Sequence, residues 1–362
     1  MFRLIVSVGL VACRLSPFVK LVVDERELHE VYPGSRLAMD LPELWFDQKV
    51  NHKACSNETF KQRYFMNHQY YKKGGPAFLF IGGEGELSSK WAQLSILNKA
   101  AEEHGGVVFA LEHRYYGKSW PTKDFSTNNL RYLSSRQALA DLATFMVKVP
   151  LPKKNRSEAG KTKWIVAGGS YPGNLAAWVR AKYPNIVTGA IASSAPVFAK
   201  EDFFEYDQQV QRTLARYGGE ACTKYHYDVF TALDAIFQSG DRHLIGQVKA
   251  DFGCSDVADS AFIDSLAYTS GIVQYNRDND VKDFCIRLKL NGTIFEKLAD
   301  FARDFKREMG SKTCQQFTGL GEALEITPNP NNAMRQWTYQ CCTEFGYWQT
   351  APHPPFRAPA QA

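Results

Sequence analysis

Several patterns that mark metal-binding, nucleic-acid-binding and membrane-spanning proteins are missing from this chain. Its 362 residues contain no CxxC and no HExxH spacing, so the sequence indicates no metal site. The 43 basic residues are scattered, without an arginine-rich helix or a basic stripe interleaved with aromatics, which argues against nucleic-acid binding. No apolar segment is long enough to cross a bilayer, so we expect no membrane span.

Nucleotide binding is also not indicated, although two glycine-rich loops suggest it at first sight. The GGEG run at 82–85 is followed by Ser88 where a dinucleotide-binding fingerprint needs its third glycine, and Glu84 would repel a pyrophosphate. The GKS run at 117–119 has Glu112 where a P-loop begins with glycine.

The composition is that of a folded globular protein, with 44% hydrophobic and 22% charged residues and a formal net charge of +5. Residues 1–18 have the basic start and short apolar run of a signal peptide. Because Arg14 makes the cleavage region atypical, a buried N-terminal strand or a wrong start site is the alternative. Export is supported by N-glycosylation sequons at Asn57, Asn155 and Asn291.

The positions of the cysteines also favour an exported protein. Six of the eight lie after residue 220, a clustering that suits an oxidising environment. Loss of Cys13 with the signal peptide would leave an odd number, so one thiol would be free or paired outside the chain. We expect the secretory pathway, with a lysosomal, endosomal or extracellular destination.

Strand and helix patterns alternate through the first half of the chain. Apolar strands are predicted near 76–81, 106–111, 164–167 and 189–195, with helices over 90–104 and 136–148 and a strand pair within 45–75. Such alternation predicts an α/β fold with a mostly parallel sheet covered on both faces. After residue 200 the pattern becomes helical, as over 227–237 and 294–309.

The run GGSYPG at 168–173 stands between an apolar strand and a helix-like segment. A serine on a sharp strand-to-helix turn is typical of a nucleophile elbow, although Pro172 replaces the last glycine of the usual pattern. The alternative is an ordinary glycine-rich connection. His113 and Glu84 follow other strands and would line the same sheet edge, but a buried structural cluster of His, Arg and Tyr is the preferred interpretation for His113.

Several motifs in order resemble the serine exopeptidase family that includes lysosomal Pro-X carboxypeptidase, dipeptidyl peptidase II and thymus-specific serine protease, with the phrase at 130–135 leaning toward the thymus-specific branch. The motifs are WFDQK at 45–49, QRYF at 62–65, GGEGE at 82–86, EHRYYGKS at 112–119, SRQALADL at 135–142, the Ser170 turn and YQCCTE at 339–344.

The resemblance implies an α/β-hydrolase fold, with a core over 40–198, a helical cap inserted over 199–345 and an irregular tail over 346–362. Ser170 would be the nucleophile, and the amides of Tyr171 and Gly83 would hold the oxyanion. No cofactor is expected, the partner would be a peptide cleaved at a proline-containing end, and a homodimer is one assembly left open.

The sequence departs from this pattern downstream. In the family an aspartate and then a histidine follow the nucleophile, yet no aspartate follows Asp304. His226, His243 and His353 are better explained as structural or surface residues. We therefore expect a C-terminally truncated chain without the last strands, poorly soluble and inactive as a peptidase. The competing class is a non-catalytic secreted binding protein; an esterase or lipase is a third.

Overall fold

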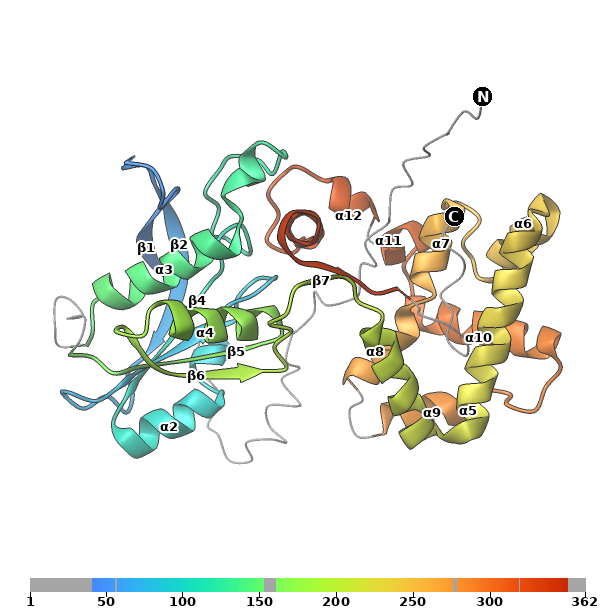
Figure 1. Ribbon diagram of the computed structural model, residues 1–362, viewed down its shortest axis with the longest axis horizontal. Helices are drawn as coiled ribbons and strands as arrows, with labels where there is room; N and C mark the ends of the chain where they lie inside the picture. The colour runs from blue at the N-terminus through green and yellow to red at the C-terminus, as the bar shows by residue number, and fades with distance from the viewer. Residues whose placement is uncertain (1–40, 56, 153–160, 276–278, 319, 351–362) are drawn as a thin grey trace, which may run out of the picture. The chain divides into compact units, whose positions relative to one another are not determined.

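The computed structural model describes residues 41–55, 57–152, 161–275, 279–318 and 320–350 (Figure 1). The expected signal peptide, Asn155 and His353 lie outside these residues. The described chain forms two compact units. The sheet unit holds residues 41–199 and Glu325–Glu344, and the helical unit holds Lys200–Leu324 and residues 345–350.

The sheet unit is built on six strands in the order β1-β2-β4-β3-β5-β6. β1 (Leu44–Lys49) and β2 (Thr59–Asn67) form the expected antiparallel pair, and β2 is antiparallel to β4. The rest of the sheet is parallel, as the continuous apolar runs predict, and consists of β3 (Ala77–Ile81), β4 (Val107–Leu111), β5 (Trp164–Gly169) and β6 (Val187–Ser193).

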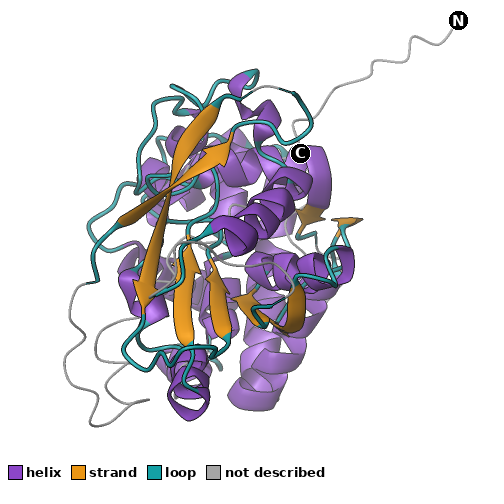
Figure 2. Cartoon of the chain, turned by 90° about the vertical axis from the view of Figure 1, so that its left-hand side faces the viewer, coloured by secondary structure: helices purple, strands orange, loops and turns teal. Residues whose placement is uncertain are grey.

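Helices cover both faces of this sheet (Figures 1 and 2). α2 (Ile96–His104) packs on one face through Leu97 and Ala101, whereas α3 (Ser135–Lys148) and α4 (Tyr171–Lys182) lie together on the other. The helix predicted over 90–104 is interrupted. A 3₁₀ turn, η1 (Ser89–Ala92), is separated from α2 by residues 93–95, and Ser95 has extended backbone angles.

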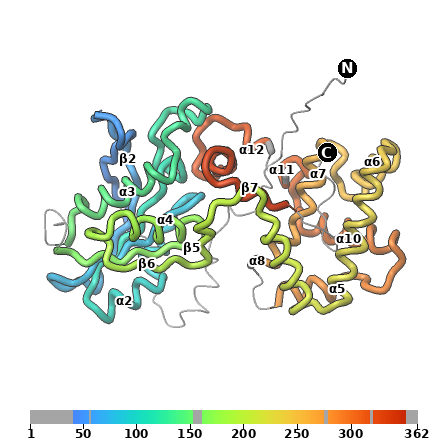
Figure 3. Tube along the Cα trace, in the orientation of Figure 1, coloured from blue at the N-terminus to red at the C-terminus, as the bar shows by residue number. Residues whose placement is uncertain are grey.

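The last part of the sheet unit comes from far along the chain. Residues Glu325–Glu344 include α13 (Met334–Gln340) and return beside the segment that follows β4, where the 3₁₀ turn η2 (Asn129–Tyr132) lies (Figure 3). The amide of Phe125 donates to the Ile326 carbonyl, at 2.8 Å, and Glu344 accepts from Ser135. These residues lie within the range that was expected to form the cap.

The helical unit begins where the sequence pattern changes from alternating strands and helices to helices, after residue 200. Its long α5 (Glu205–Ser239) is broken at Gly219, whose φ of 80° is outside helical values. α10 (Ile294–Met309) has the bounds that the apolar spacing predicts, and Thr293 and Glu296 cap its start reciprocally. The remaining elements are α6 (Arg242–Asp251), α7 (Asp259–Ser265), α8 (Tyr268–Tyr275), α9 (Asp280–Arg287), α11 (Cys314–Thr318), α12 (Leu320–Leu324), the parallel pair β7 (Lys200–Asp202) and β8 (Gly346–Trp348), and the π-helical turn η3 (Cys341–Phe345), which begins in the sheet unit.

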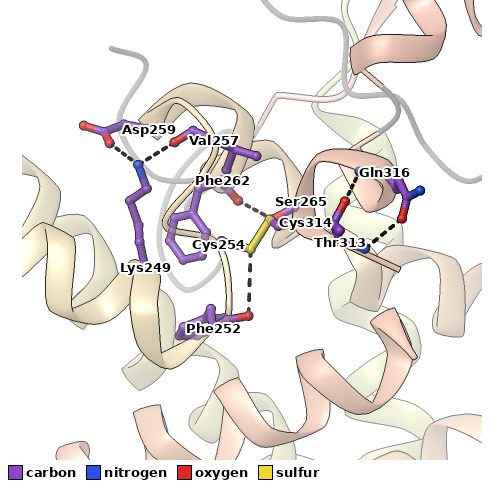
Figure 4. Close-up of a disulfide and its surroundings, with 10 residues drawn as sticks. All are labelled: Lys249, Phe252, Cys254, Val257, Asp259, Phe262, Ser265, Thr313, Cys314 and Gln316. Carbon is purple, nitrogen blue, oxygen red and sulfur yellow. Dashed lines mark hydrogen bonds and ion pairs between the residues drawn. A yellow bond between two sulfur atoms is a disulfide. The ribbon is translucent and has the colours of Figure 1, made fainter. Parts of the chain in front are cut away.

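Two disulfides tie the helical unit together. Cys222 on α5 bonds Cys285 on α9, and Cys254 after α6 bonds Cys314 on α11. Beside the second bond, the Lys249 ammonium donates to the Val257 carbonyl and to Asp259 (Figure 4). The packed aromatic core includes Phe252, Phe262, Phe284, Phe301 and Phe305.

Candidate active site

Ser170 lies on a strained turn between β5 and α4. Its φ of 59° and ψ of −132° are unusual for a residue with a side chain, and such strain is found where a side chain must be presented in one direction. The Ser170 amide donates to the Ser193 carbonyl of β6, at 3.0 Å, and the Gly173 amide donates to the Ser170 carbonyl, at 2.9 Å. The side chain is half-buried at the carboxyl edge of the parallel strands, where ligands bind in open α/β sheets.

Two glycines make this turn sterically possible. A Cβ on Gly168 would lie 2.3 Å from the Pro172 carbonyl oxygen. A Cβ on Gly173 would lie 2.9 Å from both the Ser193 carbonyl oxygen and the Ala195 Cβ. The tight strand-to-helix packing therefore requires glycine at 168 and 173, while position 172 accepts proline because it lies in the first turn of α4.

The loop after β3 lies directly against the Ser170 turn. A Cβ on Gly83 would approach the Pro172 Cγ to 2.4 Å, so the Gly83 backbone lies against the Pro172 ring with no space for a side chain between them. Within the described residues the half-buried Gly83 amide makes no hydrogen bond. A backbone donor is thus available beside the turn.

Glu84, the next residue of that loop, is a buried carboxyl. The residue is only 9% exposed, and burial raises the pKa of its carboxyl to about 7. With that pKa the carboxyl is about half protonated near neutrality, and its protonated form can donate a hydrogen bond as well as accept one. Its charge also raises the pKa of Tyr116, although burial contributes more to that pKa.

His113 is a neutral, buried side chain. Its Nδ1 bonds the Arg114 carbonyl at 2.8 Å and its Nε2 lies 3.0 Å from the Tyr171 hydroxyl. Burial lowers its pKa to about 4, so the imidazole is uncharged at neutral pH. The neighbours Arg114, Tyr115 and Tyr116 are also buried, and this environment fits the structural interpretation of the cluster.

The Ser170 hydroxyl has no hydrogen-bond partner among the residues that the structure describes. Of the histidines that follow Ser170, His226 packs in the helical unit against Phe230, Phe284 and Phe301, and burial lowers its pKa to about 3. His243 is exposed on α6. The described chain therefore offers the serine no base within hydrogen-bond reach.

Two buried arginines tie β1, β2 and α3 to the segment that follows β4. All five Arg114 donors are used, on both Asp141 oxygens and on the carbonyls of Lys49, Val50 and Tyr132. Arg63 pairs with the fully buried Glu112, which also accepts from the Leu87 and Lys118 amides and the Ser119 hydroxyl.

Sequence reasoning did not single out Gln340 as part of this region. Its side chain is fully buried and bonds both Tyr116 and Tyr171. The only local signal was its place in the YQCCTE motif at 339–344, since nothing in the spacing shows which distant segment it meets.

The described residues include two of the three predicted glycosylation sequons. Asn57 and Asn291 are exposed in loop positions. No helix in the described residues is both long and apolar enough to span a membrane. The same residues contain no cluster of three or more His, Cys, Asp or Glu side chains arranged to hold a metal ion.

Comparison with known proteins agrees with the serine turn. The family model for serine carboxypeptidase S28 matches residues 48–361. A Caenorhabditis elegans protein named provisionally as a serine protease is 36% identical over 84% of this chain and 63% of its own length. Mouse (Mus musculus) thymus-specific serine protease is 32% identical, over 84% of this chain and 64% of its own. Human (Homo sapiens) lysosomal Pro-X carboxypeptidase is 30% identical, over 83% and 64%.

The chain thus spans less than two thirds of the length of these relatives. Among solved structures, similarity to the α/β hydrolase GrgF from Penicillium sp. sh18 is low, with 17% identity and a TM-score of 0.30 over 49% of this chain and 54% of that one. The α/β-hydrolase fold is assigned instead from the strand order and the serine turn. From the match over residues 48–361 and the relatives above, the chain belongs to the serine carboxypeptidase S28 family.

Proposed function

We propose that Ser170 is the nucleophile of a serine peptidase. The observation that carries the proposal is the backbone of Ser170, held at a positive φ between a parallel strand and a helix in a residue that is only half-buried. A serine hydroxyl attacks a peptide carbonyl when a base removes its proton.

The developing oxyanion would be held by two backbone amides. The Tyr171 amide follows the nucleophile, and the Gly83 amide lies against the same turn through the Gly83–Pro172 contact. Donors placed in advance are worth about 3–4 kcal/mol each in comparable enzymes. Glu84 and His113 would line this edge of the site, and no cofactor takes part.

The substrate would be a peptide cleaved at a proline-containing chain end. Support comes from the relatives, which include a lysosomal Pro-X carboxypeptidase. The same relatives support passage through the secretory pathway to a lysosomal or extracellular destination, with glycans at the exposed Asn57 and Asn291. A homodimer stays one option for assembly.

We assign no residue of this chain as general base. Loss of a triad histidine lowers kcat about a millionfold in a serine protease, so the 362 residues alone would hydrolyse peptides negligibly. The second candidate function, a secreted binding protein that uses this fold without catalysis, is favoured by the same lack of a partner for the Ser170 hydroxyl among the described residues.

The test uses the purified chain and its Ser170→Ala variant. Each is incubated with prolyl peptides blocked at the amino end, prolyl peptides blocked at the carboxyl end, and short acyl esters. Turnover of one peptide class that Ser170→Ala abolishes would support the nucleophile and refute the expected inactivity. Hydrolysis restricted to esters would favour an esterase, and hydrolysis unaffected by Ser170→Ala would contradict the assignment.

A further inference from the structure

Four buried side chains form one chain of hydrogen bonds that reaches the Ser170 turn. The His113 Nε2 lies 3.0 Å from the Tyr171 hydroxyl, which accepts from the Gln340 Nε2 at 3.0 Å. The Tyr116 hydroxyl donates to the Gln340 Oε1 at 2.5 Å. None of the four residues is more than 4% exposed. These hydrogen bonds join the segment just after β4, the start of α4 and the last residue of α13, all within the sheet unit.

The direction of every bond in this chain is determined by one carbonyl. The Arg114 carbonyl can only accept, so the His113 Nδ1 carries the proton of the neutral ring. The Nε2 is therefore an acceptor, and the Tyr171 hydroxyl must donate to it. The oxygen of that hydroxyl then accepts from the amide nitrogen of Gln340, and the Gln340 oxygen is left to accept from Tyr116.

The opposite orientation of the Gln340 amide would be costly. With its oxygen toward Tyr171, the tyrosine would donate to the glutamine and offer only lone pairs to the His113 Nε2. That nitrogen would then need a second proton, which would place an imidazolium in a fully buried site. Burial lowers the pKa of His113 to about 4, so the charged ring is disfavoured and only one orientation satisfies all groups.

We propose that Gln340 is a positioning residue for the Ser170 turn, because it holds the Tyr171 side chain and so the backbone amide that follows the nucleophile. The inference rests on the proposed function for its link to the oxyanion, but the positioning itself is independent of catalysis. Gln340 lies 169 residues from Tyr171, so the segment after the helical unit completes the nucleophile turn. The ring of Trp337, one turn earlier on α13, also contacts Tyr171, at 5.8 Å between centroids.

The matched pair of variants is Gln340→Leu and Gln336→Leu. Both glutamines are buried on α13, but the Gln336 amide donates to the Tyr115 carbonyl and takes no part in the chain to Tyr171. Hydrogen exchange is followed at the Gly173 and Asn174 amides, which donate to the Ser170 carbonyl at 2.9 and 3.2 Å. We expect exchange at least ten times faster in Gln340→Leu than in Gln336→Leu, and equal exchange would overturn the proposal.

A conservative variant adds a readout that a purely structural residue would not move. In Gln340→Glu, a protonated carboxyl can still donate to Tyr171 and accept from Tyr116, whereas an ionised one can only accept. We expect wild-type exchange at low pH and fast exchange at high pH in Gln340→Glu, and the same profile as wild type in Gln336→Glu. A ratio of the Gln340→Glu exchange rate to the wild-type rate that does not change with pH would contradict the proposed direction of the hydrogen bonds.

Two measurements on the unmodified chain complete the test. Nitrogen NMR of the His113 ring, assigned with His113→Asn, should show protonated Nδ1 and unprotonated Nε2 at neutral pH, and the opposite tautomer would overturn the proposal. Labelling of Ser170 by a fluorophosphonate tests the proposed function separately. Labelling that Ser170→Ala abolishes would support the nucleophile, whereas absence of labelling would agree with the lack of a base and favour the binding-protein alternative; in either case the exchange and tautomer results decide the role of Gln340.

Discussion

Substitution of Gly83 by alanine tests the contact that brings the candidate oxyanion loop to the serine turn. The new Cβ would stand 2.4 Å from the Pro172 Cγ and 2.9 Å from its Cδ, about 1 Å inside the 3.4 Å of ordinary contact. The proline ring is rigid and lies in the first turn of α4, so it cannot rotate away as a flexible side chain would. Either the loop or the start of the helix must shift.

Overpacking of this kind costs about 1–3 kcal/mol of folding free energy. We expect Gly83→Ala to lower the stability of the sheet unit by that amount, measured by urea denaturation followed through tryptophan fluorescence. Gly189→Ala in β6 is the matched control, since its Cβ would meet only the Ile165 Cγ1 at 3.9 Å. That control should change stability by less than about 0.5 kcal/mol.

Removal of the proline ring should relieve the clash. In a cycle of Gly83→Ala, Pro172→Gly and the double variant, we expect a favourable coupling of about 1–2 kcal/mol, because the two residues touch. If Gly83→Ala were no more destabilising than Gly189→Ala, or if the coupling were zero, the packing of the loop on the turn would be refuted.

Three further predictions address the rest of the molecule. Arg114→Lys, which loses the paired bonds to Asp141, should destabilise the sheet unit by about 3–5 kcal/mol in urea denaturation, and an effect below about 1 kcal/mol would contradict the role of that pair. Cys254→Ser combined with Cys314→Ser, which opens a loop of 60 residues, should lower stability by about 4 kcal/mol and the Tm accordingly; an unchanged Tm would argue against the disulfide. Because the pKa of His226 is about 3 when folded and near 6.5 when unfolded, the unfolded state binds more protons between these values, so stability is complete above pH 6.5 and falls by up to about 1.4 kcal/mol per pH unit below it. His226→Gln should flatten this dependence, and an unchanged slope would point to another group.

Much of the fold could be predicted because its signals are local. The continuous apolar runs of β3, β4 and β5 predict a buried parallel sheet, and the spacing of apolar residues predicts α10 to the residue. The break before α2 was missed because Ser95 interrupts a pattern that otherwise reads as one helix.

The strand β6 lies at the edge of the described sheet, with Ile191 42% exposed, so an apolar edge is open to pairing there.

The candidate site likewise has one part that local sequence predicts and another that only the tertiary structure shows. The serine turn was identified from its glycines, its strand and its helix, which are neighbours in sequence. The contact of Gly83 with Pro172 and the disulfide pairings join residues far apart in the chain, so periodicity carries no information about them.

The sequence by itself determined the strands of the central sheet, α3 and α10, the serine turn and the family, because each follows from residues close together or from motifs in order. The tertiary structure alone decided that Glu325–Glu344 packs with the sheet unit and that Gln340 reaches Tyr171. It also decided which ring nitrogen of His113 carries the proton, because the Arg114 carbonyl faces Nδ1 and can only accept a hydrogen bond. Such features depend on the packing of distant buried groups, each of which must find a hydrogen-bond partner once water is excluded.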